Sequence, residues 1–208
     1  MLNTALSRFK ATGLLFLVGL LSLTAVYDVR LSQALRFENG VGADLARIGS
    51  WFGHGAVQIP LLALLCLLGY VLSRPRLRTA FFLALAAFVS SGILAQLVKH
   101  LVGRPRPRLL AQGIEHFGPT LASGLDSFPS GHASTAVAVA VVLSLWYPRA
   151  TPFLMFLAAF VAASRVLGGA HFIMDVLGGV CLGLIVGLII GLNKRWRSEL
   201  GVSDEFAF

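Results

Sequence analysis

Two histidines and a neighbouring carboxylate form the part of this sequence best suited to catalysis. His171 and Asp175 are four residues apart, so on a helix they would share one face. A carboxylate beside an imidazole selects its tautomer and stabilises its charged form, which leaves the other ring nitrogen free to act as a nucleophile. His132 follows Ser130 and Gly131 at the expected start of another helix, where it could serve as general acid and base.

A set of basic residues accompanies these histidines. Lys99 and Arg106 stand at and just beyond the end of one apolar segment, and Arg165 ends a later one. Arginine binds phosphate oxygens in a bidentate fashion, and such cations stabilise the charge of a phosphoryl group during its transfer. Backbone N–H groups at a helix N-terminus also bind phosphate, and Gly131 would let that backbone come close. These residue types predict a site for an anionic substrate and point to phosphoryl transfer.

Each feature also has a simpler structural interpretation. The basic residues could form a membrane-surface patch, His132 could be a packed residue, and Ser130 could be an N-cap. The pair of His171 and Asp175 could be a structural hydrogen bond. Catalysis is favoured because the features converge: if the apolar segments cross a membrane in alternating directions, the ends that carry these residues meet on one face.

The composition is that of an integral membrane protein. Of the 208 residues, 57% are hydrophobic, and the mean hydropathy is +0.83, which exceeds that of ordinary soluble domains. Six apolar stretches each approach the ~20 residues that cross a bilayer, and open strands cannot cross lipid. We therefore predict an all-α fold, a six-transmembrane-helix bundle with short loops in a single domain over 1–208, with helices near 11–28, 55–73, 79–100, 131–147, 151–168 and 171–193.

Two further segments are interpreted from their patterns. Residues 41–53 have apolar residues at helical spacing with Asp44 and Arg47 between them, which indicates either an amphipathic helix in the membrane interface or an ordinary connecting helix. The first apolar run is not followed by a signal-peptidase-like site, so we expect an uncleaved membrane helix there.

The basic residues favour an orientation with both termini in the cytoplasm. Nine lysines and arginines then lie on the inner side and eight on the outer side, or five if Lys99, Arg106 and Arg165 belong to the site. The expected location is a bacterial-type inner membrane, with the site on its periplasmic or outer face. The net charge of +8 suggests either contact with anionic lipid headgroups or adherence to the positive-inside rule. The sequence lacks a soluble basic face of the kind that binds nucleic acid.

Three motifs, in this order, resemble the signatures of the type 2 phosphatidic acid phosphatase superfamily. They are Lys99 with Arg106-Pro107, then Pro129-Ser130-Gly131-His132, then Ser164-Arg165 with His171 and Asp175. The resemblance implies a metal-independent reaction in two steps. His171 would attack phosphorus and form a phosphohistidine, His132 would protonate the leaving group and then activate water, and Asp175 would orient His171. The phosphate-binding positions implied are Lys99, Arg106, Ser130, Gly131 and Arg165.

The resemblance therefore implies a membrane lipid phosphatase that hydrolyses a phosphomonoester or diphosphate on a lipid and needs no cofactor. Candidate substrates are undecaprenyl diphosphate, phosphatidylglycerophosphate, phosphatidic acid and lipid A, and the loop over 102–128 is expected to select the headgroup. A lipid-to-lipid phosphotransferase with the same site stays open as an alternative. An anion transporter is less favoured, because transporters place charges near the membrane midplane and often contain repeats, which this sequence lacks.

No metal is expected at the site. The remaining histidines, His54, His100 and His116, complete a set of five, but no pair has ligand spacing together with a carboxylate or thiol cluster. The expected partners are a lipid phosphate or diphosphate substrate and the surrounding membrane lipids. The sequence does not indicate an oligomeric state.

Overall fold

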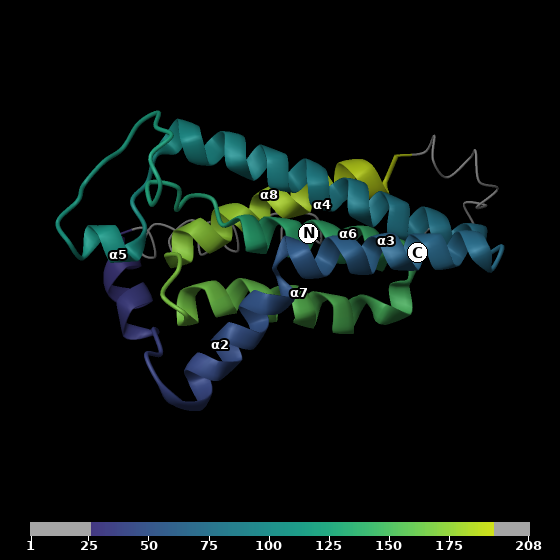
Figure 1. The fold of residues 1–208 in the computed structure, drawn as a ribbon, viewed down its shortest axis with the longest axis horizontal. Helices are drawn as coiled ribbons and strands as arrows, with labels where there is room; N and C mark the ends of the chain where they lie inside the picture. Colours follow the sequence, from purple (N-terminus) through teal and green to yellow (C-terminus); the bar gives the residue numbers. More distant parts are fainter. Residues whose placement is uncertain (1–25, 194–208) are drawn as a thin grey trace, which may run out of the picture.

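The computed structural model describes residues 26–193, and this part of the chain is helical apart from its turns and loops (Figure 1). The expected all-α class is confirmed over these residues. An initial helical segment over 26–34 is followed by α2 (Gly40–Phe52), α3 (Gly55–Val71), α4 (Pro75–Val102), α5 (Pro107–Leu110), α6 (Gly131–Trp146), the 3₁₀ turn η1 (Pro148–Ala150), α7 (Thr151–Leu167) and α8 (Ile173–Gly191).

Helices occur at five of the six predicted spans. The largest difference is at α4, which begins at Pro75 rather than at 79, because a proline in the first helical turn lacks only an N–H that would have no partner there. The predicted span over 11–28 lies outside the described residues except for 26–28, which are helical. The assignment of 1–208 to a single domain stays a prediction.

The number of membrane crossings is only partly supported. Within the described residues, three helical stretches are long and apolar enough to cross a membrane, and a fourth results if α2 and α3, bent by 48°, form one span. The α6 helix has 16 residues and falls short of that length. It is packed against α4, α7 and α8, so most of its surface contacts protein rather than lipid. Six crossings therefore remain a prediction.

Small residues bring the central helices close together. Four glycines at every fourth position of α8 face α6: Gly179, Gly183, Gly187 and Gly191. A Cβ at Gly183 would lie 2.4 Å from the backbone oxygen of Ser134, so the two backbones pack as closely as glycine permits. Because this contact extends to the first turns of α6 and α8, it sets the separation of the two segments that carry the predicted catalytic histidines.

The α2 helix packs on protein along one side and exposes apolar residues along the other. Ala43, Ala46 and Gly49 are buried, and a Cβ at Gly49 would lie 2.7 Å from Ser164 Cβ on α7. The side chains that remain exposed are large and apolar: Val41, Leu45, Ile48, Trp51 and Phe52. A helix is therefore present here, as both interpretations of the segment over 41–53 expected, and its small residues dock it on the C-terminal half of α7.

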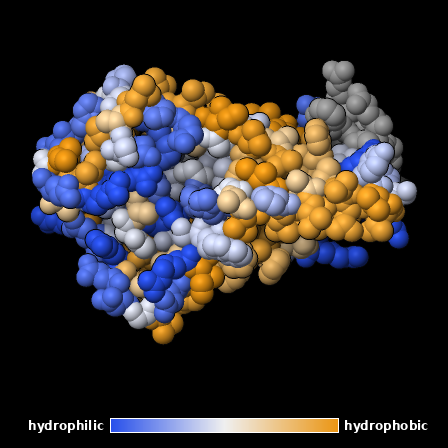
Figure 2. Space-filling model, viewed as in Figure 1, coloured by the Kyte–Doolittle hydropathy of each residue, from blue (hydrophilic) through white to orange (hydrophobic). Residues whose placement is uncertain are grey.

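Hydropathy divides the molecule along its length. Figure 2 shows hydrophilic residues gathered at the end that holds α5 and the loop over 103–130, while hydrophobic residues cover much of the bundle. Many large apolar side chains on the helices are exposed, including Leu64, Leu67, Ile93, Phe153 and Ile189. A soluble protein rarely exposes so much contiguous apolar surface, so the chain is an integral membrane protein with one broad polar end.

Replacing Gly183 by alanine is expected to lower the unfolding temperature in detergent. The new Cβ would meet the Ser134 carbonyl oxygen at 2.4 Å, and neither atom can move without separating α6 from α8. Overpacking of this kind costs about 1–3 kcal/mol. The matched control is Gly92→Ala on α4, where the nearest atom is Thr135 Cγ2 at 3.6 Å, an ordinary contact. Equal unfolding temperatures for the two variants would contradict the close α6–α8 contact.

Candidate active site

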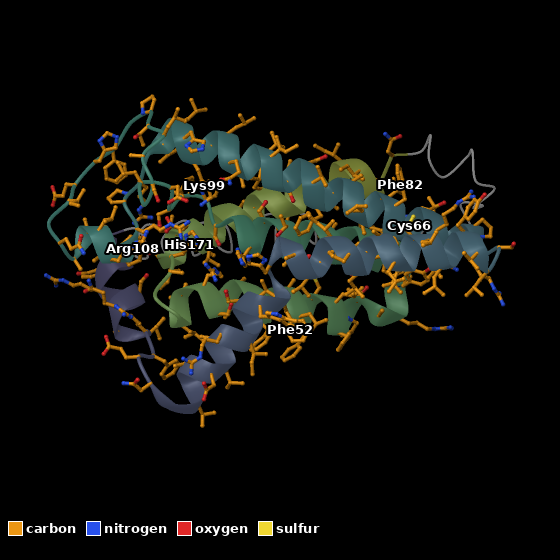
Figure 3. The ribbon with its side chains drawn as sticks, viewed as in Figure 1. Phe52, Cys66, Phe82, Lys99, Arg108 and His171 are labelled. Carbon is orange, nitrogen blue, oxygen red and sulfur yellow. The ribbon has the colours of Figure 1, made fainter. Side chains whose placement is uncertain are left out.

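The predicted site residues gather at the polar end of the bundle. Figure 3 shows Lys99 and His171 near that end, with Cys66 and Phe82 far along the helices. Six of the eight predicted residues line one cavity of about 380 Å³: Lys99, Arg106, Gly131, His132, Arg165 and His171. The other two, Ser130 and Asp175, are fully buried, and the Ser130 N–H donates to the Asp175 backbone oxygen at 2.8 Å.

His171 and Asp175 face each other, but not through the helical spacing that the sequence suggested. α8 begins at Ile173, two residues after the start predicted near 171, so His171 lies in the turn before the helix. His171 Nδ1 lies 3.6 Å from Asp175 Oδ2, which is longer than a direct hydrogen bond. Because Nδ1 is turned toward the carboxylate, Nε2 is the nitrogen left to face the cavity.

Ser127, which the sequence analysis did not select, links the pair. Its hydroxyl donates to Asp175 Oδ2 at 2.6 Å and lies 3.5 Å from His171 Nδ1. The same carboxylate oxygen accepts the Phe172 N–H at 2.9 Å. Asp175 is therefore held by donors on both sides, which fixes the carboxylate that the imidazole faces. A serine in a long loop carries no sequence signal for this contact.

Two more charged residues extend the network behind Asp175. Arg104 donates through Nη1 to Asp175 Oδ1 and through Nη2 to Asp28 Oδ2, both at 2.7 Å. Its guanidinium also lies over the Phe172 ring, 4.5 Å from the centroid. Asp28 comes from the helical segment over 26–34 and is 2% exposed. One signal could have identified Asp28, since a carboxylate at the end of an apolar membrane segment is costly unless it is paired.

The starts of α8 and α6 differ in how their backbone donors are used. At α8, side chains accept from three consecutive N–H groups: Asp175 from Phe172, Ser32 from Ile173 at 2.9 Å, and Asp28 from Met174 at 3.0 Å. At α6, Ser130 occupies the N-cap position without a side-chain cap. Its buried hydroxyl finds no partner among the described residues. The α6 terminus, with Gly131 and His132 on the cavity wall, is therefore the one free to bind an anion.

Asp126 orients two of the predicted phosphate-binding cations. Arg106 donates to both carboxylate oxygens of Asp126, at 2.8 and 2.7 Å, and Lys99 Nζ donates to the Asp126 backbone oxygen. Burial raises the pKa of the Asp126 carboxyl, but the hydrogen bonds and charge of Arg106 outweigh it and leave that pKa below its ordinary value. Asp126 therefore stays ionised and keeps both cations at the cavity.

The opposite wall of the cavity comes from α7 and from the junction of α2 with α3. Arg165 donates through Nη1 to the Ser50 hydroxyl on α2. The His54 and His132 rings meet edge to face, with centroids 6.0 Å apart. The docking of α2 on α7 thus determines where Arg165 points, and neither Ser50 nor His54 was selected from the sequence. His100 and His116 hydrogen-bond to loop carbonyls, those of Thr120 and Gly118, and do not line the cavity.

The electrostatics of the site favour a neutral His171. Burial lowers the pKa of the imidazole, the nearby Asp175 carboxylate raises it, and the charges of Lys99 and Arg165 lower it further, so that the pKa ends below the ordinary 6.5. A neutral imidazole keeps the lone pair that a nucleophile needs. Within residues 26–193, no cluster of three histidine, cysteine or acidic side chains could hold a metal ion.

Comparison with known proteins identifies the family of the chain. Residues 77–198 match the PAP2 superfamily. The chain belongs to this superfamily. The match contains all three motifs and the helices that carry them, so the family expected from the sequence is confirmed.

Two bacterial relatives are lipid phosphatases by name. The lipid A 1-phosphatase of Rhizobium etli is 33% identical over 177 residues, which cover 74% of this chain and 75% of that protein. The decaprenylphosphoryl-5-phosphoribose phosphatase of Mycobacterium tuberculosis is 38% identical over 153 residues, which cover 70% and 76%. The expected activity class of this PAP2 protein, a lipid phosphatase, is thereby confirmed.

A solved structure supports the fold. The transmembrane PAP2-type phosphatidylglycerolphosphate phosphatase of Bacillus subtilis superposes with a TM-score of 0.60 at 22% identity, over 89% of this chain and 96% of that one. At this identity the likeness concerns the fold, which is that of a membrane PAP2 protein.

Removing the Ser127 hydroxyl is expected to lower kcat. Ser127→Ala takes the 2.6 Å donor from Asp175 and leaves a buried carboxylate oxygen short of a partner, a loss of about 1–3 kcal/mol, or roughly fivefold to a hundredfold in rate. The control is Ser134→Ala, since Ser134 is equally buried and its hydroxyl has no partner in the described part of the chain. Steady-state kinetics would contradict the assignment if both variants kept the wild-type kcat.

Proposed function

We propose that this protein hydrolyses a membrane lipid phosphate or diphosphate without a metal, through a phosphohistidine on His171. The observation that carries the proposal is the single cavity lined by two histidines and three cations, with Asp175 behind one of the histidines. An imidazole backed by a carboxylate suits nucleophilic attack, and a second histidine on the same cavity suits proton transfer.

The first step forms a bond from His171 Nε2 to phosphorus and breaks the bond from phosphorus to the lipid oxygen. His132 gives its proton to that oxygen, so the lipid leaves as an alcohol or, from a diphosphate, as a monophosphate. Asp175 stabilises the positive charge that the His171 imidazole acquires. In the second step His132 takes a proton from water, the water oxygen attacks phosphorus, and the bond to His171 breaks to release inorganic phosphate.

The phosphoryl oxygens would be bound by cations and by backbone donors together. Lys99, Arg106 and Arg165 line the cavity from three different elements. The open N-terminus of α6, with Ser130 and Gly131, adds N–H groups aimed at the same space. Charge stabilisation of this kind is commonly the largest catalytic contribution.

An apolar cavity beside the site offers a place for the lipid chain. Its volume is about 180 Å³, and it is lined by residues of α3, α6 and α7 together with Phe52 of α2 and Phe81 of α4. Gly53 stands between the two cavities, because a Cβ there would lie 2.5 Å from Val161 Cγ1 in the apolar wall and 2.8 Å from His132 Cδ2 in the site. A lipid entering sideways between α3 and α7 could thus place its phosphate at His132 and its chain among apolar side chains.

The distribution of charged residues between the two ends of the molecule supports the orientation proposed for the chain. The polar end with the site would face the periplasm or outer side of a bacterial-type inner membrane, with both termini in the cytoplasm. The opposite end of the described helices carries Arg74, Arg76, Arg78 and Arg149, as expected for a cytoplasmic face.

The proposed reaction is tested by phosphate release from a panel of lipids, with EDTA present and His171→Ala alongside. The panel holds undecaprenyl diphosphate, phosphatidylglycerophosphate, phosphatidic acid, lipid A and, in view of the M. tuberculosis relative, decaprenylphosphoryl phosphoribose. Release from one lipid should resist EDTA and fall by on the order of a thousandfold in the variant. His116→Ala, outside the cavity, should keep the wild-type rate. Undiminished turnover by His171→Ala, or loss of turnover in EDTA, would overturn the mechanism.

The proposed lipid chain site makes a separate prediction. Leu157→Trp should fill the apolar cavity and raise KM for a long-chain lipid phosphate by about tenfold, while KM for a water-soluble, short-chain analogue stays unchanged, since only the long chain loses its buried apolar contacts. Ile93→Trp is the control, because Ile93 is exposed on α4 and does not line the cavity. Equal effects on both substrates would exclude this cavity as the chain site.

A further inference from the structure

The Asp28 carboxylate is buried and accepts hydrogen bonds from donors of three kinds. Its Oδ2 accepts from Arg104 at 2.7 Å, and its Oδ1 accepts from the Met174 N–H at 3.0 Å and from the Ser32 hydroxyl at 3.4 Å. In all three contacts the carboxylate oxygen of Asp28 is the acceptor. Asp28 lies outside the three motifs, on the helical segment over 26–34, yet it reaches the first turn of α8, directly after His171.

The charges in this network do not cancel. Arg104 contributes one positive charge and bonds two carboxylates, those of Asp28 and Asp175, at equal distances of 2.7 Å. The three side chains together carry one net negative charge. With asparagine at position 28, the guanidinium of Arg104 would neutralise Asp175 alone, and the group behind the imidazole would carry no net charge.

The groups around His171 are mostly cationic, so the net negative charge behind its ring matters for catalysis. Lys99 on α4 and Arg165 on α7 act on the imidazole with positive charge, and His132 on α6 also lies within electrostatic range. Asp175 is the acidic side chain in contact with the His171 ring. When His171 attacks phosphorus its ring becomes positively charged among these cations, so the transition state depends on the negative charge that remains on Asp175.

We propose that Asp28 is a positioning residue of the catalytic site, which preserves the negative charge of Asp175 by sharing Arg104 with it. At the same time Asp28 fixes the first turn of α8 through the Met174 N–H. This inference rests on the roles proposed for His171 and Asp175, and it adds to the catalytic site one residue, Asp28, from the segment over 26–34. Capping alone would not require a carboxylate, because the Ser32 hydroxyl already accepts the neighbouring Ile173 N–H without charge.

The test uses Asp28→Asn in the full-length protein, with phosphate release from its lipid substrate measured against pH. Asparagine keeps the shape and can still accept the Met174 N–H, so the substitution removes mainly the charge. We expect kcat to fall by about tenfold or more and KM to change by less than about threefold, since the lost interaction acts in the transition state. Removing a negative charge also lowers the pKa of the His171 imidazole, so the acid limb of the kcat profile should move to lower pH.

Two further variants separate charge from structure. Ser32→Ala removes a cap from α8 and should lower the unfolding temperature, while the acid limb stays at its wild-type pH. Arg104→Gln removes the shared cation, so adding Asp28→Asn to it should lower kcat no further and should restore stability by removing an unpaired buried carboxylate. This comparison remains decisive even if Asp28→Asn alone folds poorly.

A wild-type kcat and pH profile in Asp28→Asn would overturn the inference. It would also be overturned if the reductions in kcat caused by Asp28→Asn and by Arg104→Gln multiplied in the double variant. Both results are distinct from a failure of the proposed mechanism. That failure would appear as full activity in His171→Ala.

Discussion

The geometry of the site depends on two ion pairs made by one guanidinium. Arg104 lies 2.7 Å from a carboxylate oxygen of Asp28 and 2.7 Å from one of Asp175. Burying such charges costs desolvation energy, and removing one partner strongly destabilises the folded protein because the other charge is left buried and unpaired. Here the pair joins three segments far apart in the chain: the helical segment over 26–34, the loop after α4, and the start of α8. Because all three meet at Arg104, the proposed nucleophile His171, its carboxylate neighbour Asp175 and the cationic loop are fixed relative to one another.

The two helix N-termini at the site use their backbone donors differently, and the proposed role in substrate binding falls to that of α6. Side chains of Asp28, Ser32 and Asp175 take the first backbone donors of α8, which stabilises the turn that presents His171. The α6 terminus keeps its donors for the cavity, since its N-cap residue Ser130 makes no side-chain cap. A site with both termini capped would lose its backbone anion donors, and one with both open would leave the His171 turn without support.

Glycine packing connects this end of the molecule to the body of the bundle. The contact between α6 and α8 is so close that a methyl group at Gly179 or Gly183 would meet backbone oxygens at 2.4 Å. The separation of His132 and His171 therefore follows from a backbone contact that flexible side chains cannot alter. On the other side of the cavity, α2 holds Arg165 through Ser50 and leads into the bend at Gly53 that separates the polar site from the apolar cavity. The loop over 102–128 supplies Arg104, Arg106 and Asp126 to the site, and its predicted part in headgroup selection stays a prediction.

The sequence by itself determined the family, the helical class, the membrane location and the lipid phosphatase activity. Motif spacing and apolar segment length are local properties that need no tertiary information. It also located five of the helices to within a few residues, the largest differences being at the start of α4, which Pro75 extends, and at the start of α8, which follows the turn before Ile173. Only the tertiary structure decided the partners of the motif residues. Five residues hydrogen-bond to partners that lie 20 to 146 residues away in the sequence: Asp28, Ser50, Arg104, Asp126 and Ser127. The position of Asp28 at the end of an apolar segment signals that it needs a partner, but no local pattern shows which residue that partner is, because buried polar groups are paired only when the chain folds.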